Sequence, residues 1–365
     1  PDPQPIASVM QPPRNPETAD HTTIPVPFIS VLAPCYNEER HIAAFIDGIL
    51  RQDYPAARME VLLIDGMSTD RTREIIRGCS SKHAFIRLLE NDRRFVPHAL
   101  NLGIRSSSGE VIVRMDVHSE YPANYLSRLV SERTRLNADN TGGVWIMRPS
   151  GSSLLSLALA EAQSSVFGVG NAAYRKGTGK IRRVDTVPYG CFPRNLFDRI
   201  GMFDEDLLRN QDDEFNARIN QNGGSVWLIP DVKIIYHSRP TVSSLCRMFY
   251  QYAFFKPLVN LKLKRPATVR QFIPPLFVVF LLLGWVPALL HPMAAFVYIA
   301  GICLYAAAGF VATATAVRRT GKVLLIFYLP WLFFLQHLAY GTGYWIGIVE
   351  FVLLKRRYAT IASSR

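Results

Sequence analysis

Along residues 28–120 of this 365-residue chain, apolar runs alternate with segments of helical periodicity. Four apolar runs have the length and the β-branched content of buried strands: 28–34, 59–64, 85–89 and 111–115. In the three segments between them, apolar residues recur at helical spacing: 40–52, 70–79 and 96–106. This alternation predicts an α/β fold in which helices cover both faces of a parallel sheet.

The pattern changes after residue 240. Residues 241–268 mix aromatic with basic side chains, which predicts an amphipathic helix region at the cytoplasmic membrane surface. Three apolar tracts follow, each long enough to span a bilayer: 272–290, 293–316 and 323–353. The third tract precedes the basic residues 355–357, so it can be a hairpin or partly an interfacial helix. We expect a transmembrane region of three or four apolar segments over 269–354 and a basic tail over 355–365.

The amino-acid composition agrees with a division of the chain near residue 270. Hydrophobic residues make up 49% of the chain and the mean hydropathy is +0.10, with the excess after residue 270. The formal net charge of +12 suits anionic lipid or anionic substrates, and no nucleic-acid partner is expected because no nucleic-acid module is recognisable. The Pro-rich, polar residues 1–27 predict a disordered tail without a signal peptide. The scattered cysteines predict reduced thiols: Cys35, Cys79, Cys191, Cys246 and Cys303.

Polar side chains follow the predicted strands, at the sheet edge where α/β proteins bind ligands. They are Asn37, Glu38, Asp65, Asp92 and Asp116. Oxygen atoms at that edge can bind a base and a ribose, and they can bind phosphate through a metal ion. Asp116 and His118 are two residues apart, so in an extended segment they point the same way and can hold Mg²⁺ or Mn²⁺. An ordinary polar strand end is the alternative, because Asp-x-His alone is a weak signal.

Four segments resemble successive motifs of the family 2 glycosyltransferases: 34–38 (PCYNE), 64–70 (IDGMSTD), 99–103 (ALNLG) and 116–118 (DVH). The resemblance implies a GT-A fold with a Rossmann-like mixed sheet over a cytoplasmic catalytic domain, residues 28–240, followed by C-terminal transmembrane helices. The family's usual metal motif is Asp-x-Asp, from which this chain departs at His118. The sequences of the segments 65–70, 116–119 and 142–145 (GGVW) are most similar to those of the glucosyltransferases of succinoglycan-type exopolysaccharide synthesis.

The resemblance also implies roles for individual residues. Nine of them would contact a nucleotide-sugar donor, most plainly UDP-glucose: Pro34, Tyr36, Asn37, Glu38, Asp65, Asp92, Asn101, Asp116 and His237. Residues 184–190 would form a strand that faces the acceptor, with Asp185 and Tyr189 as sugar contacts. The basic segment 169–183 could be a solvated loop, or it could close over the donor or the acceptor.

Residues 210–218 (NQDDEFNAR) place three acids in a row, where a helix start is the plain alternative. The segment resembles the family's Glu-Asp-x-Asp-Leu-x-x-Arg motif, with Arg218 setting the register and Gln211 replacing the first Glu. Asp212 is then the expected base that takes the proton of the acceptor hydroxyl, with Asp213 as the substitute. Gln211, Glu214 and Arg218 are expected on the acceptor side.

The sequence thus predicts an inverting, metal-dependent, multi-pass glycosyltransferase of the bacterial inner membrane. It would move a hexose from the nucleotide-sugar to a polyprenyl-diphosphate-linked glycan, in contact with membrane lipids and with possible polysaccharide-assembly proteins. Two alternatives stay open. One is a processive polysaccharide synthase, and the other is a membrane-anchored nucleotide-sugar-binding scaffold with a degenerate site.

Overall fold

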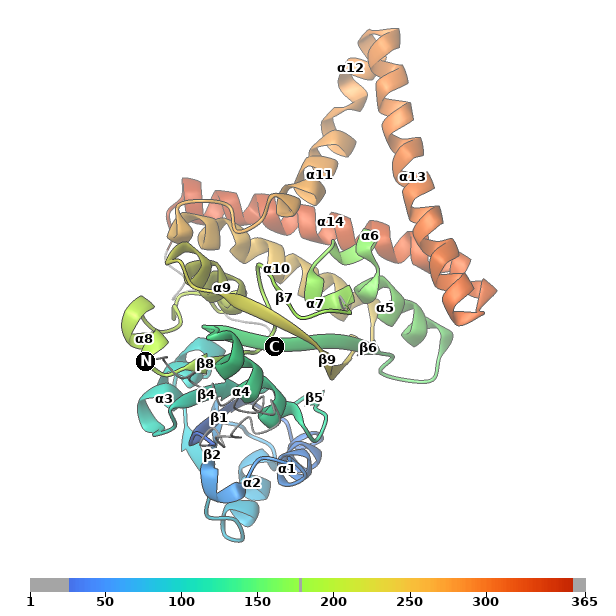
Figure 1. Cartoon of the computed structure of the whole chain (residues 1–365). Helices are drawn as coiled ribbons and strands as arrows, with labels where there is room; N and C mark the ends of the chain where they lie inside the picture. The colour runs from blue at the N-terminus through green and yellow to red at the C-terminus, as the bar shows by residue number, and fades with distance from the viewer. Residues whose placement is uncertain (1–25, 177–178, 357–365) are drawn as a thin grey trace, which may run out of the picture.

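A computed structural model describes residues 26–176 and 179–356 of the chain (Figure 1). The tail predicted over 1–27 lies outside the described residues except for its last two positions. Of the predicted basic tail, only residues 355 and 356 are described.

The first half of the catalytic domain has the predicted alternation of strands and helices. Its four parallel strands stand in the order β3-β2-β1-β4: β1 (Ile29–Cys35), β2 (Met59–Asp65), β3 (Ile86–Glu90) and β4 (Val111–Arg114). The helices between them are α1 (Ile42–Leu50), α2 (Thr72–Ser80) and α3 (Val96–Ser106), with a short 3₁₀ turn η1 (Ala56–Arg58) before β2. The observed bounds differ from the predicted ones by only a few residues.

The second half makes the sheet mixed. It adds β5 (Ser119–Glu120), β6 (Asn140–Arg148), β7 (Arg182–Arg183), β8 (Cys191–Pro193) and β9 (Val226–His237). Strand β8 is antiparallel to both β4 and β6, β9 is parallel to β6, and β5 and β7 are antiparallel to β9. The strand predicted over 184–190 is wrong. Those residues form a loop, because Pro188 offers no backbone N–H and the next two residues have positive φ angles of 61° and 118°.

Helices cover both faces of this sheet because successive strand residues point to opposite faces. Val31 packs with side chains of α1 and α2, whereas its neighbour Leu32 packs with side chains of α3 and with Phe215. In the second half the sheet is covered by α4 (Tyr125–Leu136), α7 (Ala173–Lys176), α8 (Asn195–Ile200) and α9 (Gln211–Gln221). The helices α5 (Leu154–Ser164) and α6 (Val166–Val169) bury their apolar side chains mainly against the helices after residue 240. Each large apolar side chain buried here stabilises the fold by roughly 1.5–3 kcal/mol.

The C-terminal part is helical throughout. It comprises α10 (Val242–Leu263), η2 (Val269–Phe272), α11 (Ile273–Leu283), α12 (Trp285–Leu290), α13 (Pro292–Thr320), η3 (Val323–Phe327), α14 (Leu329–Gly347) and η4 (Ile348–Leu353). Three stretches are long and apolar enough to cross a membrane: Val269–Leu290, Pro292–Thr320 and Val323–Leu353. They correspond to the three predicted tracts. In Figure 1, α11 to α13 rise as a hairpin away from the catalytic domain, and α14 lies across the base of that hairpin, above α10.

Helix α14 is held against α10 by close backbone contact at two glycines. A Cβ atom added to Gly343 would lie 2.4 Å from the carbonyl oxygen of Tyr250, and one added to Gly347 would lie 2.2 Å from that of Phe254. No larger residue fits at these positions without moving the helices apart. The apolar C-terminal part is therefore packed directly on α10, the helix that follows the mixed sheet.

Candidate active site

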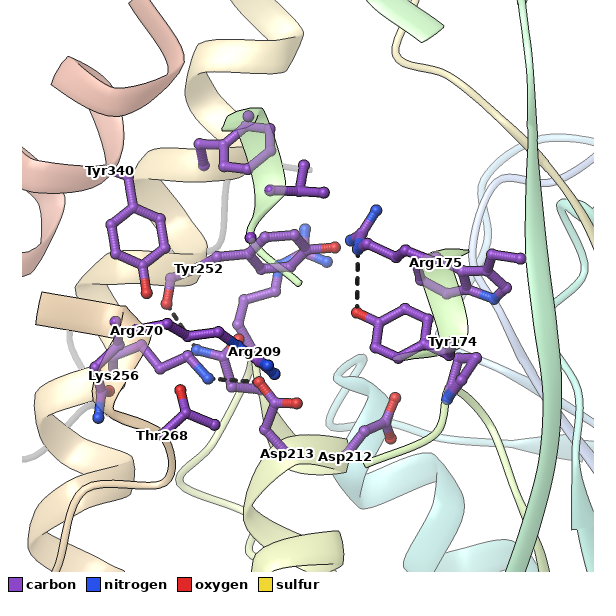
Figure 2. Close-up of a pocket in the computed structure, with 18 of the residues that line it drawn as sticks. Tyr174, Arg175, Arg209, Asp212, Asp213, Tyr252, Lys256, Thr268, Arg270 and Tyr340 are labelled. Carbon is purple, nitrogen blue, oxygen red and sulfur yellow. Dashed lines mark hydrogen bonds and ion pairs between the residues drawn. The ribbon is translucent and has the colours of Figure 1, made fainter. Parts of the chain in front are cut away.

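A cavity of about 630 Å³ lies where the catalytic domain meets the C-terminal helices (Figure 2). The catalytic domain contributes the predicted site residues Asp116, His118, Tyr189, Gln211, Asp212 and Asp213 to its lining. The C-terminal helices contribute Ile273, Pro274, Phe277, Tyr305, Gln336 and Tyr340. The polar residues singled out from the sequence and the apolar residues of the hairpin therefore share one space.

Asp116 and His118 reach this cavity by a route that differs from the predicted one. Strand β4 ends at Arg114, and the backbone N–H of Ser119 donates to the carbonyl oxygen of Asp116 at 3.2 Å, which closes a turn. The two side chains therefore share the cavity because of a turn, not because of strand alternation. His118 Nδ1 lies 3.5 Å from a carboxylate oxygen of Glu38, at the end of the neighbouring strand β1.

Arg114 is a buried cation that the sequence reasoning missed. Its guanidinium lies 3.2 Å from a carboxylate oxygen of Asp116 and also pairs with Asp212, 98 residues along the chain. Burial by itself would lower the pKa of Arg114, but the charges of Asp116 and Asp212 raise it. A charge in the middle of an apolar strand must have a partner. That rule was the one signal in the sequence that could have marked it.

Asp212 and Asp213 open helix α9 but differ in their surroundings. The chain turns into this helix at Asn210, whose φ of 62° is left-handed. Burial raises the pKa of Asp212 to about 7, opposed by Arg114 and supported by the negative charges of Asp116 and Asp213. Asp213 is also buried, but Lys256 Nζ at 2.5 Å is chief among the neighbours that lower its pKa. Of the two, Asp212 is the better proton acceptor near neutral pH.

Aromatic rings form one wall of the cavity. Trp145 stacks on Tyr236 with a centroid separation of 4.5 Å and an interplanar angle of 13°, and it meets the ring of Tyr174 edge-on at 5.2 Å. The hydroxyl group of Tyr189 lies 2.6 Å from that of Ser119. Flat aromatic faces beside polar groups suit a sugar ring, which is apolar on its faces and polar at its edge.

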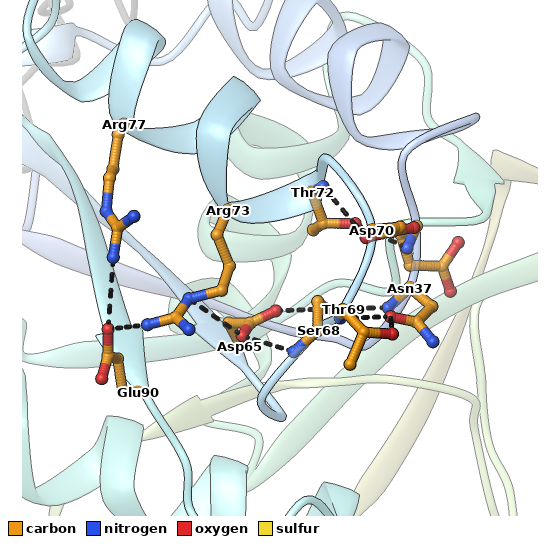
Figure 3. Close-up of polar contacts among 10 residues, drawn as sticks. Asn37, Asp65, Ser68, Thr69, Asp70, Thr72, Arg73, Arg77 and Glu90 are labelled. Atoms are coloured by element: carbon orange, nitrogen blue, oxygen red, sulfur yellow. Dashed lines mark hydrogen bonds and ion pairs between the residues drawn. The ribbon is translucent and has the colours of Figure 1, made fainter.

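A second polar network lies at the ends of β1 and β2 (Figure 3). Asp65 is fully buried, and its carboxylate accepts the backbone N–H of Ser68 at 2.9 Å and the hydroxyl of the same residue. Arg73 Nε lies 3.7 Å from the same carboxylate. Asn37 accepts the backbone N–H of Thr69 at 2.9 Å. These contacts fix the loops after β1 and β2 relative to one another.

Residues 30–200 match the family model described as glycosyl transferase family 2. They are a family 2 glycosyltransferase domain. The match confirms the resemblance on which the sequence interpretation rests.

Relatives extend the similarity beyond this domain. The succinoglycan biosynthesis protein ExoA of Rhizobium meliloti (strain 1021) is 28% identical over 334 residues, which is 90% of this chain and 96% of that protein. The dolichyl N-acetyl-alpha-D-glucosaminyl phosphate 3-beta-D-2,3-diacetamido-2,3-dideoxy-beta-D-glucuronosyltransferase of Methanococcus voltae is 25% identical over 329 residues, 88% and 98% of the two chains. At this coverage both alignments extend into the C-terminal helices.

A solved structure shares the fold. The mannosyltransferase PcManGT from Pyrobaculum calidifontis, in complex with GDP-Man and Mn²⁺, has a TM-score of 0.54 and 23% identity, and the match covers 90% of this chain and 88% of that one. The chain thus has the predicted GT-A fold with its mixed sheet, followed by three apolar helices that could cross a membrane.

Several residues assigned to the donor or the acceptor lie outside the cavity lining. On the donor side they are Pro34, Tyr36, Asn37, Glu38, Asp65, Asp92, Asn101 and His237. Asp92 is exposed beyond β3. Asn101 is buried and exchanges hydrogen bonds of 2.9 and 3.0 Å with the backbone of Phe203. His237 lies 2.7 Å from Glu120. Their donor roles stay predictions.

On the acceptor side, Asp185, Glu214 and Arg218 also lie outside the cavity lining. Glu214 and Arg218 pair with each other at 2.8 Å, and Arg218 also donates to two backbone carbonyls of the segment 200–202. Their contacts hold α9 in place, which positions Asp212 at its start. Asp185 pairs with Arg270 at 2.9 Å, close to the start of the first apolar helix.

A metal ion would need more than the protein to hold it. Among residues 26–176 and 179–356, no three or more His, Cys, Asp and Glu side chains gather as a metal site would require. Asp116 and His118 offer one oxygen and one nitrogen ligand at the cavity. Mg²⁺ and Mn²⁺ often bind one or two protein ligands together with substrate phosphates, and this pair fits such a shared site.

Five further cations line the cavity: Arg175, Arg209, Arg239, Lys256 and Arg270. Arg175 belongs to the basic segment 169–183, for which closure over the donor or the acceptor was one of two interpretations, and the other four were not assigned to the site from the sequence. Lys256 stands in the segment interpreted as a membrane-surface helix, where basic residues are ordinary. Its contact with Asp213 comes only from the fold, since 43 residues separate the two.

Proposed function

We propose that this family 2 glycosyltransferase moves a hexose from a nucleotide-diphosphate sugar to a lipid-linked glycan, with inversion and with the help of a divalent cation. The observation that carries the proposal is the shared cavity. It joins Asp212, a carboxylate with a pKa of about 7, to the apolar side chains of the C-terminal hairpin. In an acceptor with a polar glycan and an apolar anchor, the glycan would lie against the polar residues around Asp212 and the anchor against the apolar side chains of the hairpin.

In the proposed mechanism, Asp212 accepts the proton of the acceptor hydroxyl while that oxygen attacks the anomeric carbon in a single displacement. Arg114 holds Asp212 and Asp116 in fixed positions. The attacking oxygen of the acceptor and the departing nucleoside diphosphate are therefore aligned on opposite sides of the anomeric carbon. When bound at Asp116 and His118, the cation would offset the charge that develops on the nucleoside diphosphate. The wall formed by Trp145 and Tyr236 would hold the sugar ring and keep water from the anomeric carbon.

The donor and acceptor classes draw support from the relatives. ExoA is named for succinoglycan biosynthesis, and the name of the Methanococcus voltae enzyme specifies a dolichyl phosphate-linked acceptor. We propose UDP-glucose as the first donor to test and a polyprenyl-diphosphate-linked glycan as the acceptor. The relatives match the apolar helices as well as the catalytic domain, which favours an acceptor held at the membrane.

The placement in the membrane follows from charge and contacts. Arg319, at the end of α13, pairs with Glu161 of the catalytic domain, so the hairpin returns to the side on which it began. A third of the apolar stretch that contains α14 is buried, against 11% and 6% for the two preceding stretches. We propose that α11 to α13 cross the bacterial inner membrane as a hairpin and that α14 lies in the cytoplasmic interface. Residues 355–356 then stay on the cytoplasmic side, as the positive-inside rule requires.

The test is a transfer assay with the full chain in lipid nanodiscs. UDP-glucose, other nucleotide-sugars, Mn²⁺ or Mg²⁺ and an undecaprenyl-diphosphate-linked oligosaccharide are supplied, and products are identified by mass spectrometry. We expect one added hexose with inverted anomeric configuration by NMR. The Asp212→Asn variant should lose transfer, whereas Asp198→Asn, at an exposed position on α8, should keep it. Long polymer products would favour a processive synthase, and donor binding without turnover would favour a scaffold.

A further inference from the structure

Three cations gather on the side of the cavity that faces the membrane helices. They are Arg209 before α9, Lys256 of α10 and Arg270 of η2, the turn that leads into α11. Figure 2 shows them beside Tyr252, Thr268 and Tyr340, while Tyr174 and Arg175 lie on the other side of Asp212 and Asp213. The three residues, called the membrane-side cations below, come from separate segments that only the fold brings together.

The membrane-side cations carry more positive charge than their protein partners balance. Lys256 pairs with Asp213 at 2.5 Å, and Arg270 pairs with Asp185 at 2.9 Å. Arg209 donates to the side-chain oxygen of Gln251 at 3.2 Å, and none of the carboxylates that the structure describes forms an ion pair with it. Around the whole cavity, six Lys and Arg side chains face three carboxylates. The excess suits an anionic ligand.

The residues proposed to bind the donor diphosphate come from a different part of the fold than the membrane-side cations. The proposed cation ligands Asp116 and His118 lie at the end of β4, within the catalytic domain. Arg175 packs over Trp145 at 5.1 Å, Trp145 stacks on Tyr236, and the ring of Tyr236 meets that of His118 with centroids 5.7 Å apart. Two further arginines, Arg175 and Arg239, are therefore available to a donor without the help of the membrane-side cations.

The membrane-side cations adjoin an apolar path toward the bilayer. Arg270 is three residues before Ile273, which is 67% exposed at the start of α11. The cavity lining continues from Arg270 to Pro274, Phe277 and Tyr305, and the rings of Phe277 and Tyr305 stack at 4.1 Å. A phosphate bound here could carry an apolar chain along α11 and α13 while its glycan extends toward Asp212.

We propose that Arg209, Lys256 and Arg270 bind the phosphate group that joins the glycan of the acceptor to its lipid. This inference rests on the proposed function and assigns a binding site to it. Guanidinium groups donate paired hydrogen bonds to phosphate oxygens, and partial burial strengthens those bonds. A phosphate held here sets the distance between the lipid and Asp212, so only hydroxyl groups close to the phosphate reach the base.

The experiment measures lipid binding and donor binding separately. The full chain is placed in phosphatidylcholine nanodiscs, and retention of radiolabelled undecaprenyl diphosphate is compared with that of undecaprenol. A parallel titration measures the affinity for UDP with Mn²⁺. The variants are Arg209→Gln and Arg270→Gln. The control is Arg265→Gln, which removes one positive charge from an exposed position between α10 and η2, five residues before Arg270. Lys256 is left intact because its loss would leave Asp213 buried without its cation.

The wild type should bind undecaprenyl diphosphate at least tenfold more tightly than undecaprenol, as expected when hydrogen bonds to a charged group are added. Each cavity variant should lose about tenfold of that preference and keep its affinity for UDP, while Arg265→Gln changes neither. Equal binding of the two lipids, or loss of UDP affinity in place of lipid affinity, would overturn the proposal. Phosphate-dependent lipid binding without hexose transfer would instead overturn the proposed function and leave this site standing.

Discussion

Replacing Asp212 by Asn should slow transfer and stabilise the protein, and the second effect should depend on pH. The substitution removes the carboxylate that takes the acceptor proton, which typically costs 10²–10⁴ in rate. It also removes a carboxylate that burial and neighbouring negative charges make unfavourable when ionised. Activity and stability should therefore move in opposite directions at the same residue.

The size of the stability change follows from the pKa. Asp212 titrates near 3.8 when unfolded and at about 7 when folded, so the folded state holds a proton that the unfolded state releases between these values. Stability therefore falls as pH rises from about 4 to 7, and the loss is complete above 7. A pKa difference of about three units corresponds to about 4 kcal/mol in the free energy of unfolding. This value is an upper limit because the Asp212 side chain is 27% exposed and because Arg114 loses one partner on substitution.

We therefore expect Asp212→Asn to be more stable than the wild type by about 1–3 kcal/mol at pH 8 and by almost nothing at pH 4, with an apparent Tm several degrees higher at pH 8. Thermal unfolding of the nanodisc-embedded chain at both pH values measures this. The comparison is Asp213→Asn, which should lose stability at pH 8 because Lys256 is left without its partner. A wild-type activity that does not rise through pH 7, or an Asp212→Asn variant less stable than the wild type at pH 8, would refute the reasoning.

Three further substitutions test the rest of the site. Gly347→Val should separate α14 from α10, since even a Cβ atom would lie 2.2 Å from the backbone oxygen of Phe254. A lower apparent Tm and easier proteolysis after residue 320 would show this separation. Ser68→Ala removes the hydroxyl group that donates to Asp65 and accepts the backbone N–H of Asn37 at 2.8 Å, and it keeps the backbone N–H contact to Asp65. It should weaken UDP binding severalfold with little change in kcat, measured by steady-state kinetics. Asp116→Asn should raise the Mn²⁺ concentration needed for half-maximal transfer by at least tenfold, and unchanged metal dependence would exclude it as a ligand.

The parts of the fold that depend on local pattern could be predicted from the sequence. The strands from Ile29 to Arg114 and the three apolar tracts were predicted within a few residues, because burial imposes a periodic pattern on neighbouring positions. The strand over 184–190, which the family resemblance implied, was wrong because the positive φ angles of Tyr189 and Gly190 are incompatible with an extended strand. The turn at Asp116 was missed for a related reason: its hydrogen bond to Ser119 leaves no trace in apolar periodicity.

Contacts between distant segments account for what the sequence could not predict about the site. Asp212 and Asp213 are adjacent and chemically identical, yet one has a raised and the other a lowered pKa. Burial acts to raise the pKa of both acids, and at Asp212 Arg114, about a hundred residues before it, offsets only part of that effect. At Asp213 the charge of Lys256, some forty residues after it, leads the interactions that outweigh burial and lower the pKa. Motif similarity names Asp212 as the expected base and Asp213 as the substitute, and the fold supplies the physical difference between the two. Because Lys256 belongs to α10, on which α14 packs, the charge that distinguishes the two acids is held in place by the membrane-facing helices. A mutation that loosens α14 should therefore alter the pH dependence of the catalytic domain as well as its attachment to the membrane.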